Sequence, residues 1–172
     1  MRSACPRSGQ ARSRGNDREQ QPVSERAVRL GRSHFRLFRA IPTRWADNDA
    51  YGHVNNVVYY SWFDTAVNAW LIEQGHLDLA GSKIVGLVVE TACTYFESVA
   101  FPETIEAGIA VEKLGRSSVT YRIGIFRRDG EQAAAQGRFT HVYVGRASQK
   151  PAPIPAGLRD AFQALAVSDA PG

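Results

Sequence analysis

A short polar stretch, residues 47–56, holds the side chains whose types and spacing could carry out chemistry. Asp47 and Asp49 lie in a run of turn-forming residues that closes at Gly52. Apolar residues then recur at helical spacing over 57–71. The pattern predicts a loop of carboxylates against a helix N-terminus, where N–H groups are unpaired and the helix dipole is positive. A carboxylate there can cap the helix or serve as a base beside an oxyanion site, and the residue types alone leave both roles open.

The sequence contains none of the common motifs for nucleophilic serine, nucleotide or metal chemistry. It has no Gly-x-Ser-x-Gly elbow, no P-loop, no Rossmann glycine fingerprint and no metal-binding motif. The two cysteines, Cys5 and Cys93, form neither a metal-ligand spacing nor a disulfide framework, and no serine has a recognisable catalytic partner. A carboxylate is therefore the remaining candidate for a catalytic group, and we expect no metal and no bound cofactor.

These chemical groups must be positioned by the elements around them, which alternate between strand and helix patterns. In chain order we expect a strand at 34–43, the polar loop at 44–53, a long helix at 55–73 that stops at Gly75, strands at 84–96, 104–114, 117–128 and 132–144, and a short helix at 156–166. The dipeptide Asp129-Gly130 predicts a hairpin between the last two strands.

The order of elements predicts an α+β fold in one domain. A lone strand cannot bury one long helix, so an antiparallel sheet of about five strands must curve around it. We expect residues 1–33, which are rich in Arg and Ser, to form a disordered extension, with a helical turn at most over 27–30. The domain then spans 34–145, and 146–172 form a proline-rich connector and the short helix.

The net charge of +4 is carried by the first 33 residues. Eight of the 21 basic and three of the 17 acidic residues lie there, so residues 34–172 hold 13 basic and 14 acidic side chains. A nucleic-acid-binding face on the folded part is therefore not expected. No apolar run reaches the ~20 residues of a membrane helix, and the N-terminus has no apolar signal region. We expect a cytoplasmic protein with no nucleic-acid partner and no membrane span.

The polar stretch also resembles a known family. After an aromatic residue, Trp45, it reads D-x-D-x-x-G-H-V-N-N-x-x-Y, from Asp47 to Tyr59. This pattern resembles the 4-hydroxybenzoyl-CoA thioesterase branch of the hotdog-fold acyl-CoA thioesterases, and the resemblance extends over about 35–143. It implies a hotdog fold, an acyl-CoA substrate, and a homodimer or homotetramer with its sites at the subunit interface.

The resemblance assigns roles to residues of the loop and helix. Asp49 matches the catalytic carboxylate, acting as general base or as nucleophile, and both routes stay open. Asp47 is expected to be a turn former or cap. Oxyanion or positioning roles fall to residues at the start of the helix, namely Gly52, His53, Val54, Asn55 and Asn56. Tyr59 and Phe63 are expected in the acyl pocket, with further lining from 87–96.

A second cluster could bind the coenzyme A part of the substrate. Arg116, Ser117 and Ser118 follow a glycine turn at the start of a strand, where relatives place basic and hydroxyl groups for phosphate and pantetheine. A solvated strand end is the plainer interpretation of the same residues. Two alternative functions remain at this stage: a non-catalytic acyl-CoA-binding module, or a hotdog hydratase acting on enoyl-CoA. The acyl group is not specified.

Overall fold

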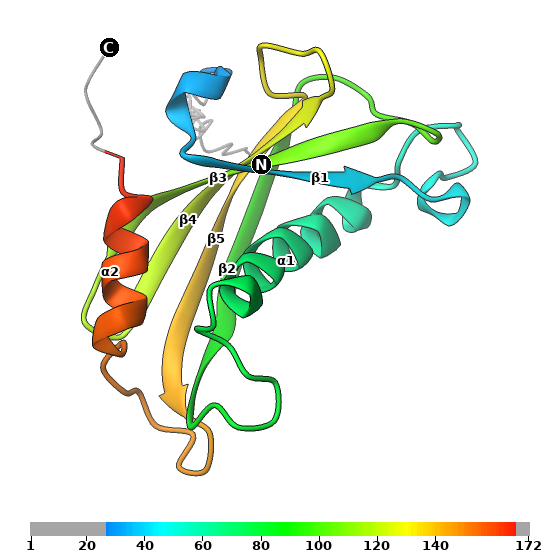
Figure 1. The fold of residues 1–172 in the computed structure, drawn as a ribbon. Coiled ribbons are helices and arrows are strands. Elements are labelled where there is room, and N and C mark those ends of the chain that lie inside the picture. The colour runs from blue at the N-terminus through cyan, green and yellow to red at the C-terminus, as the bar shows by residue number, and fades with distance from the viewer. Residues whose placement is uncertain (1–26, 168–172) are drawn as a thin grey trace, which may run out of the picture.

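The computed structural model describes residues 27–167, and its elements follow the predicted order closely (Figure 1). They are η1 (Arg32–His34), β1 (Leu37–Pro42), η2 (Trp45–Asp47), α1 (Asn56–Glu73), β2 (Ile84–Tyr95), β3 (Thr104–Leu114), β4 (Ser118–Arg127), β5 (Ala135–Gly145) and α2 (Ala156–Ala164). The two 3-10 turns are the additions that the sequence patterns did not predict. The expected disorder of residues 1–26 lies outside the described residues.

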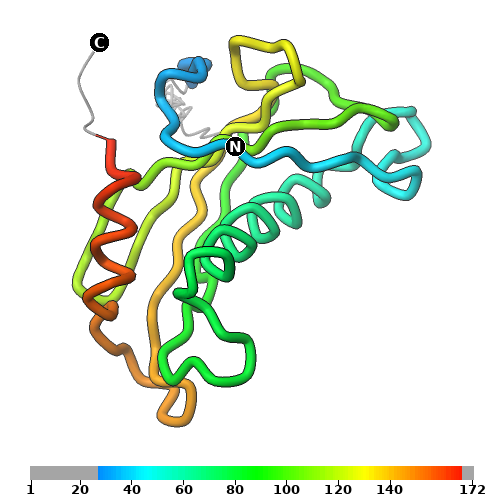
Figure 2. The backbone as a smooth tube through the Cα atoms, viewed as in Figure 1, coloured from blue at the N-terminus to red at the C-terminus, as the bar shows by residue number. Residues whose placement is uncertain are grey.

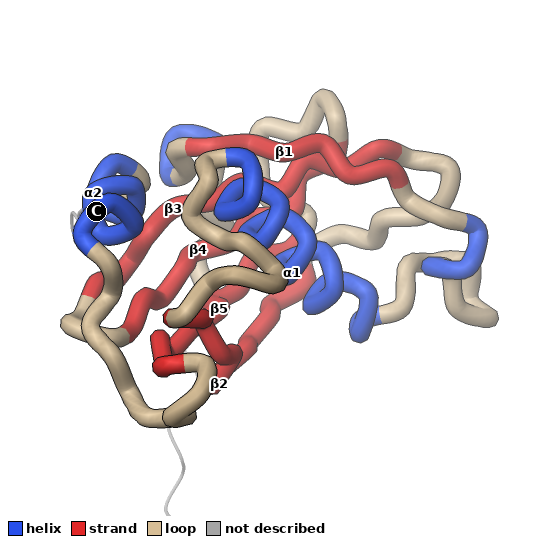
Figure 3. The backbone as a smooth tube through the Cα atoms, turned by 60° about the horizontal axis from the view of Figure 1, so that its bottom comes forward, coloured by secondary structure: helices blue, strands red, loops and turns tan. Residues whose placement is uncertain are grey.

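The five strands form one antiparallel sheet in the order β1-β3-β4-β5-β2, which confirms the predicted α+β fold. The sheet curves around α1, which lies along its concave face, while α2 packs beside β3 (Figures 1 and 2). The view in Figure 3 shows the same strands behind both helices. β2 lies at one edge of the sheet and pairs with β5 alone.

Burial of one whole side of α1 holds the helix against the sheet. Its seven buried side chains are Tyr59, Trp62, Phe63, Ala66, Val67, Trp70 and Leu71, and they pack on inward-facing residues of β3, β4 and β5. Each large apolar side chain buried in this way stabilises the fold by roughly 1.5–3 kcal/mol. Asn55 caps the N-terminus, and Gly75, with φ of +71°, follows the last turn as predicted. The helix axis and its N-terminus are therefore fixed.

Part of the predicted disordered extension is ordered instead. Within residues 27–33, the Arg32 Nε donates to the Gly130 carbonyl at 2.8 Å and its Nη2 pairs with Glu106 at 2.6 Å. The Arg29 Nε donates to the Ala133 carbonyl at 2.7 Å. An arginine-rich composition favours solvated, disordered chain. A guanidinium can, however, also donate hydrogen bonds to several backbone carbonyl oxygens that are left free at a turn. These residues therefore belong to the folded body. Over residues 27–30 no helical turn forms.

Residues after β5 also join the core. Leu158 and Phe162 on α2 are buried, and Leu165 just beyond it is buried with them. Among residues 27–167, neither helix is long and apolar enough to span a membrane.

Candidate active site

The loop before α1 is anchored by Asp47, which is 1% exposed. Its Oδ2 accepts from the Arg44 backbone N–H at 2.7 Å, and its Oδ1 accepts from the Arg44 guanidinium at 2.8 Å. The Asp47 carbonyl accepts from the Asn55 N–H at 2.9 Å. Both carboxylate oxygens are therefore engaged within the loop, as a turn-forming residue requires, and neither is directed at a substrate.

Asp49 is placed differently. Its Oδ1 accepts from the Tyr51 N–H at 2.8 Å, and its backbone closes a tight turn with His53 and Gly52, at 2.8 and 3.1 Å. Gly52 has φ of +81°, a conformation that suits glycine. The Asp49 Oδ2 has no hydrogen-bond partner within residues 27–167. One oxygen therefore fixes the side chain and the other is available.

Asp49 does not cap the helix, which removes one of the two roles left open by the sequence. The N-cap is Asn55, whose Oδ1 accepts from the Val57 N–H at 3.1 Å. An amide oxygen in that position satisfies one of the unpaired N–H groups of the first turn. The carboxylate of Asp49 is therefore not needed for this purpose.

Of the four backbone amides over 54–57 that could hold an oxyanion, three are already used. Val54 donates to the Val99 carbonyl at 2.8 Å, Asn55 donates to Asp47, and Val57 donates to the Asn55 side chain. The Asn56 N–H has no acceptor within the described part of the chain. As the first residue of α1, Asn56 also lies at the positive end of the helix dipole.

A groove of about 400 Å³ lies between the loop, the start of α1 and the segment after β2. It brings together seven of the predicted residues and two others: Asp49, His53, Val54, Asn56, Tyr59, Tyr95 and Phe96, with Glu97 and Ser98. An open groove of this size can hold a thioester and part of its acyl group. Asp49 and Asn56, which each carry an available polar atom, therefore line the same groove.

Aromatic rings form the floor of the groove. Tyr59 is buried, and its ring lies 5.0 Å from Tyr95 and 5.0 Å from Trp62, measured between centroids. Burial raises the pKa of Tyr59 to about 12, so its phenol is neutral at physiological pH. The Tyr95 hydroxyl donates to the Asn56 carbonyl at 3.2 Å, which ties the end of β2 to the first turn of α1. Aromatic side chains of α1 and β2 therefore line one side of the groove.

Several residues predicted for the site lie elsewhere. Gly52 and Asn55 shape the loop and the cap without lining the groove. Asn56 does line the groove, but its side chain makes no hydrogen bond to the Asp49 loop within residues 27–167. Phe63 is fully buried and packs on Phe139, with ring centroids 6.3 Å apart, because it is on the side of α1 that faces the sheet.

Arg116, Ser117 and Ser118 are also remote from Asp49 within one chain. β3 begins near the groove and runs for 11 residues before the turn that holds them, which is about 35 Å of extended chain. The carbonyls of Arg116 and Ser117 accept from Ile154 and Tyr143. Consecutive antiparallel strands place successive turns at opposite ends of a sheet, so this cluster and the loop are separated.

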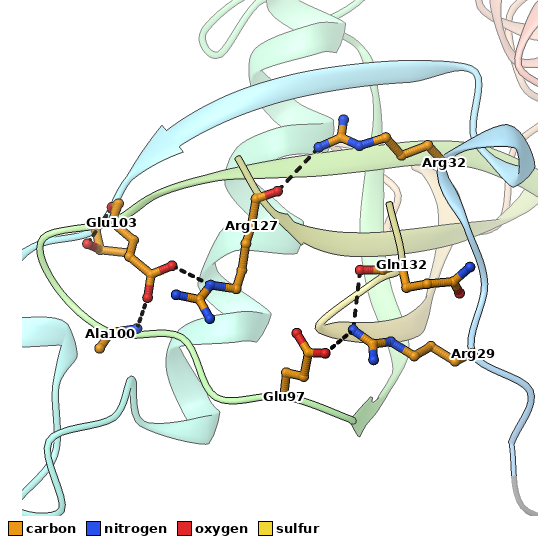
Figure 4. Close-up of polar contacts among 8 residues, drawn as sticks. Arg29, Arg32, Glu97, Ala100, Glu103, Arg127 and Gln132 are labelled. Carbon is orange, nitrogen blue, oxygen red and sulfur yellow. Dashed lines mark hydrogen bonds and ion pairs between the residues drawn. The ribbon is translucent and has the colours of Figure 1, made fainter. Parts of the chain in front are cut away.

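The segment after β2 contributes residues that sequence analysis did not predict. Tyr95 and Phe96 fall in the predicted lining of 87–96, but Glu97 and Ser98 do not. The Glu97 carboxylate pairs with the Arg29 guanidinium at 2.7 Å (Figure 4). No local pattern marks Glu97, because its place in the groove depends on contact between distant segments.

Glu103 forms hydrogen bonds that connect the segment after β2 to β4. One of its carboxylate oxygens accepts from the Ala100 N–H at 3.0 Å, and the other pairs with the Arg127 Nε at 2.7 Å (Figure 4). The wall of the groove is thereby held to β4. Within residues 27–167, no group of three or more His, Cys, Asp or Glu residues is arranged to hold a metal ion.

Comparison with known proteins identifies the family and the fold. Residues 43–162 match the family model described as Thioesterase-like superfamily. The structure is similar to the crystal structure of the PA5185 protein from Pseudomonas aeruginosa strain PAO1, at 52% sequence identity and a TM-score of 0.80, over 82% of this chain and 99% of that one. A search of curated proteins gives no match.

Two solved thioesterases are more distant. The BH1999 gentisyl-coenzyme A thioesterase is 24% identical, with a TM-score of 0.65 over 73% of this chain and 99% of that one. The DHNA-CoA thioesterase from Staphylococcus aureus is 25% identical, with a TM-score of 0.64 over 74% of this chain and 86% of that one. These likenesses confirm the hotdog fold that the sequence resemblance implied.

Proposed function

Because the chain belongs to the thioesterase-like superfamily and is a thioester hydrolase, we propose that it cleaves acyl-CoA thioesters in the Asp49 groove. The observation that carries the proposal is the pairing of two available groups in one groove, the Asp49 Oδ2 and the Asn56 N–H. The first can activate water or attack the carbonyl carbon. The second can hold the oxygen on which negative charge develops.

In the first route Asp49 acts as a general base. The carboxylate removes a proton from water, the water oxygen bonds to the thioester carbon, and the carbonyl oxygen becomes an oxyanion bound by the Asn56 N–H. The carbon–sulfur bond then breaks, and the coenzyme A thiolate leaves and takes up the proton. One well-aimed donor of this kind contributes roughly 3 kcal/mol to transition-state stabilisation.

In the second route Asp49 is the nucleophile. Its oxygen bonds to the thioester carbon, the thiolate leaves, and water hydrolyses the resulting anhydride to the free acid and the original carboxylate. The same oxyanion donor serves both steps. Tyr59 and Tyr95 would contact the acyl group, and His53 would contact substrate or water at the rim of the groove. No cofactor takes part beyond the substrate's own coenzyme A.

A second copy of the chain would complete the site. β2 is an edge strand, and its exposed residues include Leu87, Val88 and Val89. An unpaired apolar edge of this kind is a template for pairing with another strand, and a symmetric pair is the commonest assembly. Antiparallel pairing of β2 with its copy would close the groove of each subunit at the end of β2.

The same pairing supports a role for Arg116, Ser117 and Ser118. Ser118 pairs with Val142 on β5, near the end where β5 pairs with the start of β2. In an antiparallel pair of β2 strands, that end of one subunit adjoins the groove of the other. We therefore place the coenzyme A phosphates and pantetheine of one site near this cluster of the second copy.

The test is release of free thiol from a panel of acyl-CoA thioesters by the full chain, followed with a thiol-trapping dye. Asp49→Asn should abolish turnover, and Asp160→Asn, an exposed acid on α2, is the matched control that should retain it. Unchanged turnover in Asp49→Asn would refute the assignment. Ligand binding without thiol release would indicate a binding module, and loss of enoyl absorbance would indicate a hydratase.

A further inference from the structure

A small cavity of about 40 Å³ lies under the other end of β2, on the side of the sheet that faces α1. Its lining comes from α1, the loop after it, the start of β2 and the end of β5: Asn68, Leu71, His76, Leu77, Ile84, Val85, Gly86, His141 and Tyr143. It is separate from the Asp49 groove and plays no part in the mechanism described above.

Buried polar atoms at this cavity have no partner in the chain. His141 is 2% exposed and Tyr143 is 3% exposed. Both ring nitrogens of His141 and the hydroxyl of Tyr143 have no hydrogen-bond partner within residues 27–167. A buried polar group without a partner costs roughly 1–3 kcal/mol, and native proteins seldom leave one unsatisfied. The Tyr143 hydroxyl lies close to the buried hydroxyl of Tyr121. The ring nitrogens of His141 therefore require a partner that the described residues do not supply.

Gly86 leaves room beside these two side chains. A Cβ added there would lie 3.1 Å from the His141 Nδ1 and 3.3 Å from the Tyr143 Cζ, which is tighter than ordinary packing. A side chain in this position would therefore narrow the cavity.

The size and chemistry of the cavity define what fits. A space of about 40 Å³ holds one small polar group but no ring. Burial lowers the pKa of His141 to about 4 and raises the pKa of Tyr143 to about 12, so both are neutral near pH 7. Neutral imidazole and phenol can each donate and accept a hydrogen bond. They match an uncharged hydroxyl.

Within one chain this cavity is far from the catalytic groove. Gly86 and Tyr95 are nine residues apart on β2, about 30 Å along the strand. In the proposed dimer the cavity of one subunit would lie near the groove of the other. Antiparallel pairing of two β2 strands brings the start of one strand beside the end of the other. Residues of α1 line both cavities, so the two lie on the same side of the sheet.

We propose that His141 and Tyr143 of one subunit bind a hydroxyl at the far end of the acyl group whose thioester is cleaved at Asp49 of the other subunit. The proposal rests on the proposed function and extends it to acyl specificity. The cavity of about 40 Å³ that one subunit encloses would hold only this hydroxyl. The body of the acyl group would lie between the two subunits.

The test compares kcat/KM for pairs of thioesters that differ only in a terminal hydroxyl, benzoyl-CoA against 4-hydroxybenzoyl-CoA and hexanoyl-CoA against 6-hydroxyhexanoyl-CoA. The wild-type chain should favour the hydroxylated member of at least one pair. Tyr143→Phe removes one hydrogen-bonding group and should reduce that preference by about tenfold. Gly86→Ala narrows the cavity and should reduce it too, while Gly31→Ala, where a Cβ meets only ordinary contacts, should retain it.

The outcomes separate this proposal from the proposed function. Thiol release that depends on Asp49 but shows no hydroxyl preference, or a preference unchanged in both variants, would overturn the role of His141 and Tyr143 alone. Absence of Asp49-dependent thiol release would overturn both. If Tyr143→Phe does not fold, judged by its circular dichroism, His141→Gln takes its place. A crystal structure with a non-hydrolysable hydroxyacyl-CoA analogue that shows only water in the cavity would also exclude the proposal.

Discussion

Asp49 and Asn56 line the same groove, and the Asp49 Oδ2 and the Asn56 backbone N–H have no hydrogen-bond partner within residues 27–167. The two residues are held by different means. Asp49 is fixed by the amide of Tyr51, and Asn56 is fixed by its place as the first residue of α1. The proposed base and the proposed oxyanion donor are therefore each held in place within the described residues.

The two aspartates of the loop should respond in opposite ways to the same substitution. Asp47→Asn weakens buried hydrogen bonds to a charged partner and should lower the free energy of unfolding by about 1.5–3 kcal/mol. Asp49→Asn should change it by less than about 0.5 kcal/mol while removing turnover. Urea denaturation of both variants, together with thiol release, measures the difference. Equal loss of stability in the two would contradict the assigned roles.

The cap of α1 should link stability to activity. Asn55→Ala leaves the Val57 N–H without its acceptor and should cost about 1 kcal/mol of folding stability. The first turn carries the Asn56 donor, so kcat should fall as well. Asn55→Asp keeps the acceptor and is the matched control. Thermal unfolding and steady-state kinetics measure both effects, and an alanine variant with unchanged kcat would show that the cap does not position the donor.

A charge placed on the free edge of β2 should dissociate the proposed dimer. Val89→Lys adds a charge to an exposed apolar residue of this strand, a device that natural edge strands use against pairing. Analytical ultracentrifugation should show a monomer with reduced thiol release. Ala164→Lys, at the exposed end of α2, adds the same charge away from the edge and should remain a dimer. A monomeric wild-type chain with full activity would rule out a shared site.

Acid should destabilise the protein through His141. Burial lowers the pKa of His141 from 6.5 to about 4, so between these values the unfolded chain takes up a proton that the folded chain does not. Stability from this residue is complete above about pH 6.5 and falls by about 3 kcal/mol as the pH drops to about 4. Denaturation at a series of pH values should show a shallower decline in His141→Gln. An identical decline would mean that another group causes the acid sensitivity.

Local patterns in the sequence were enough to predict the elements and their order. The helical spacing of apolar residues over 57–71, the stop at Gly75 and the Asp129-Gly130 turn each depend on residues close together in the chain. The boundaries of α1 and β3 were predicted to within one residue for that reason. The family followed from the pattern between Trp45 and Tyr59, which is also local.

Contacts between distant segments decided the rest. Asp47 and Asp49 are chemically alike and two residues apart, yet only folding buries one against Arg44 and leaves the other with an available oxygen. The Val54 N–H is not available because it donates to the carbonyl of Val99, a residue that follows β2 and is distant in sequence. Periodicity records which face of an element is apolar, but it carries no information about which polar atoms meet across the fold. The sequence therefore determined the scaffold and the candidate residues, and the tertiary structure determined which atoms remain available for chemistry.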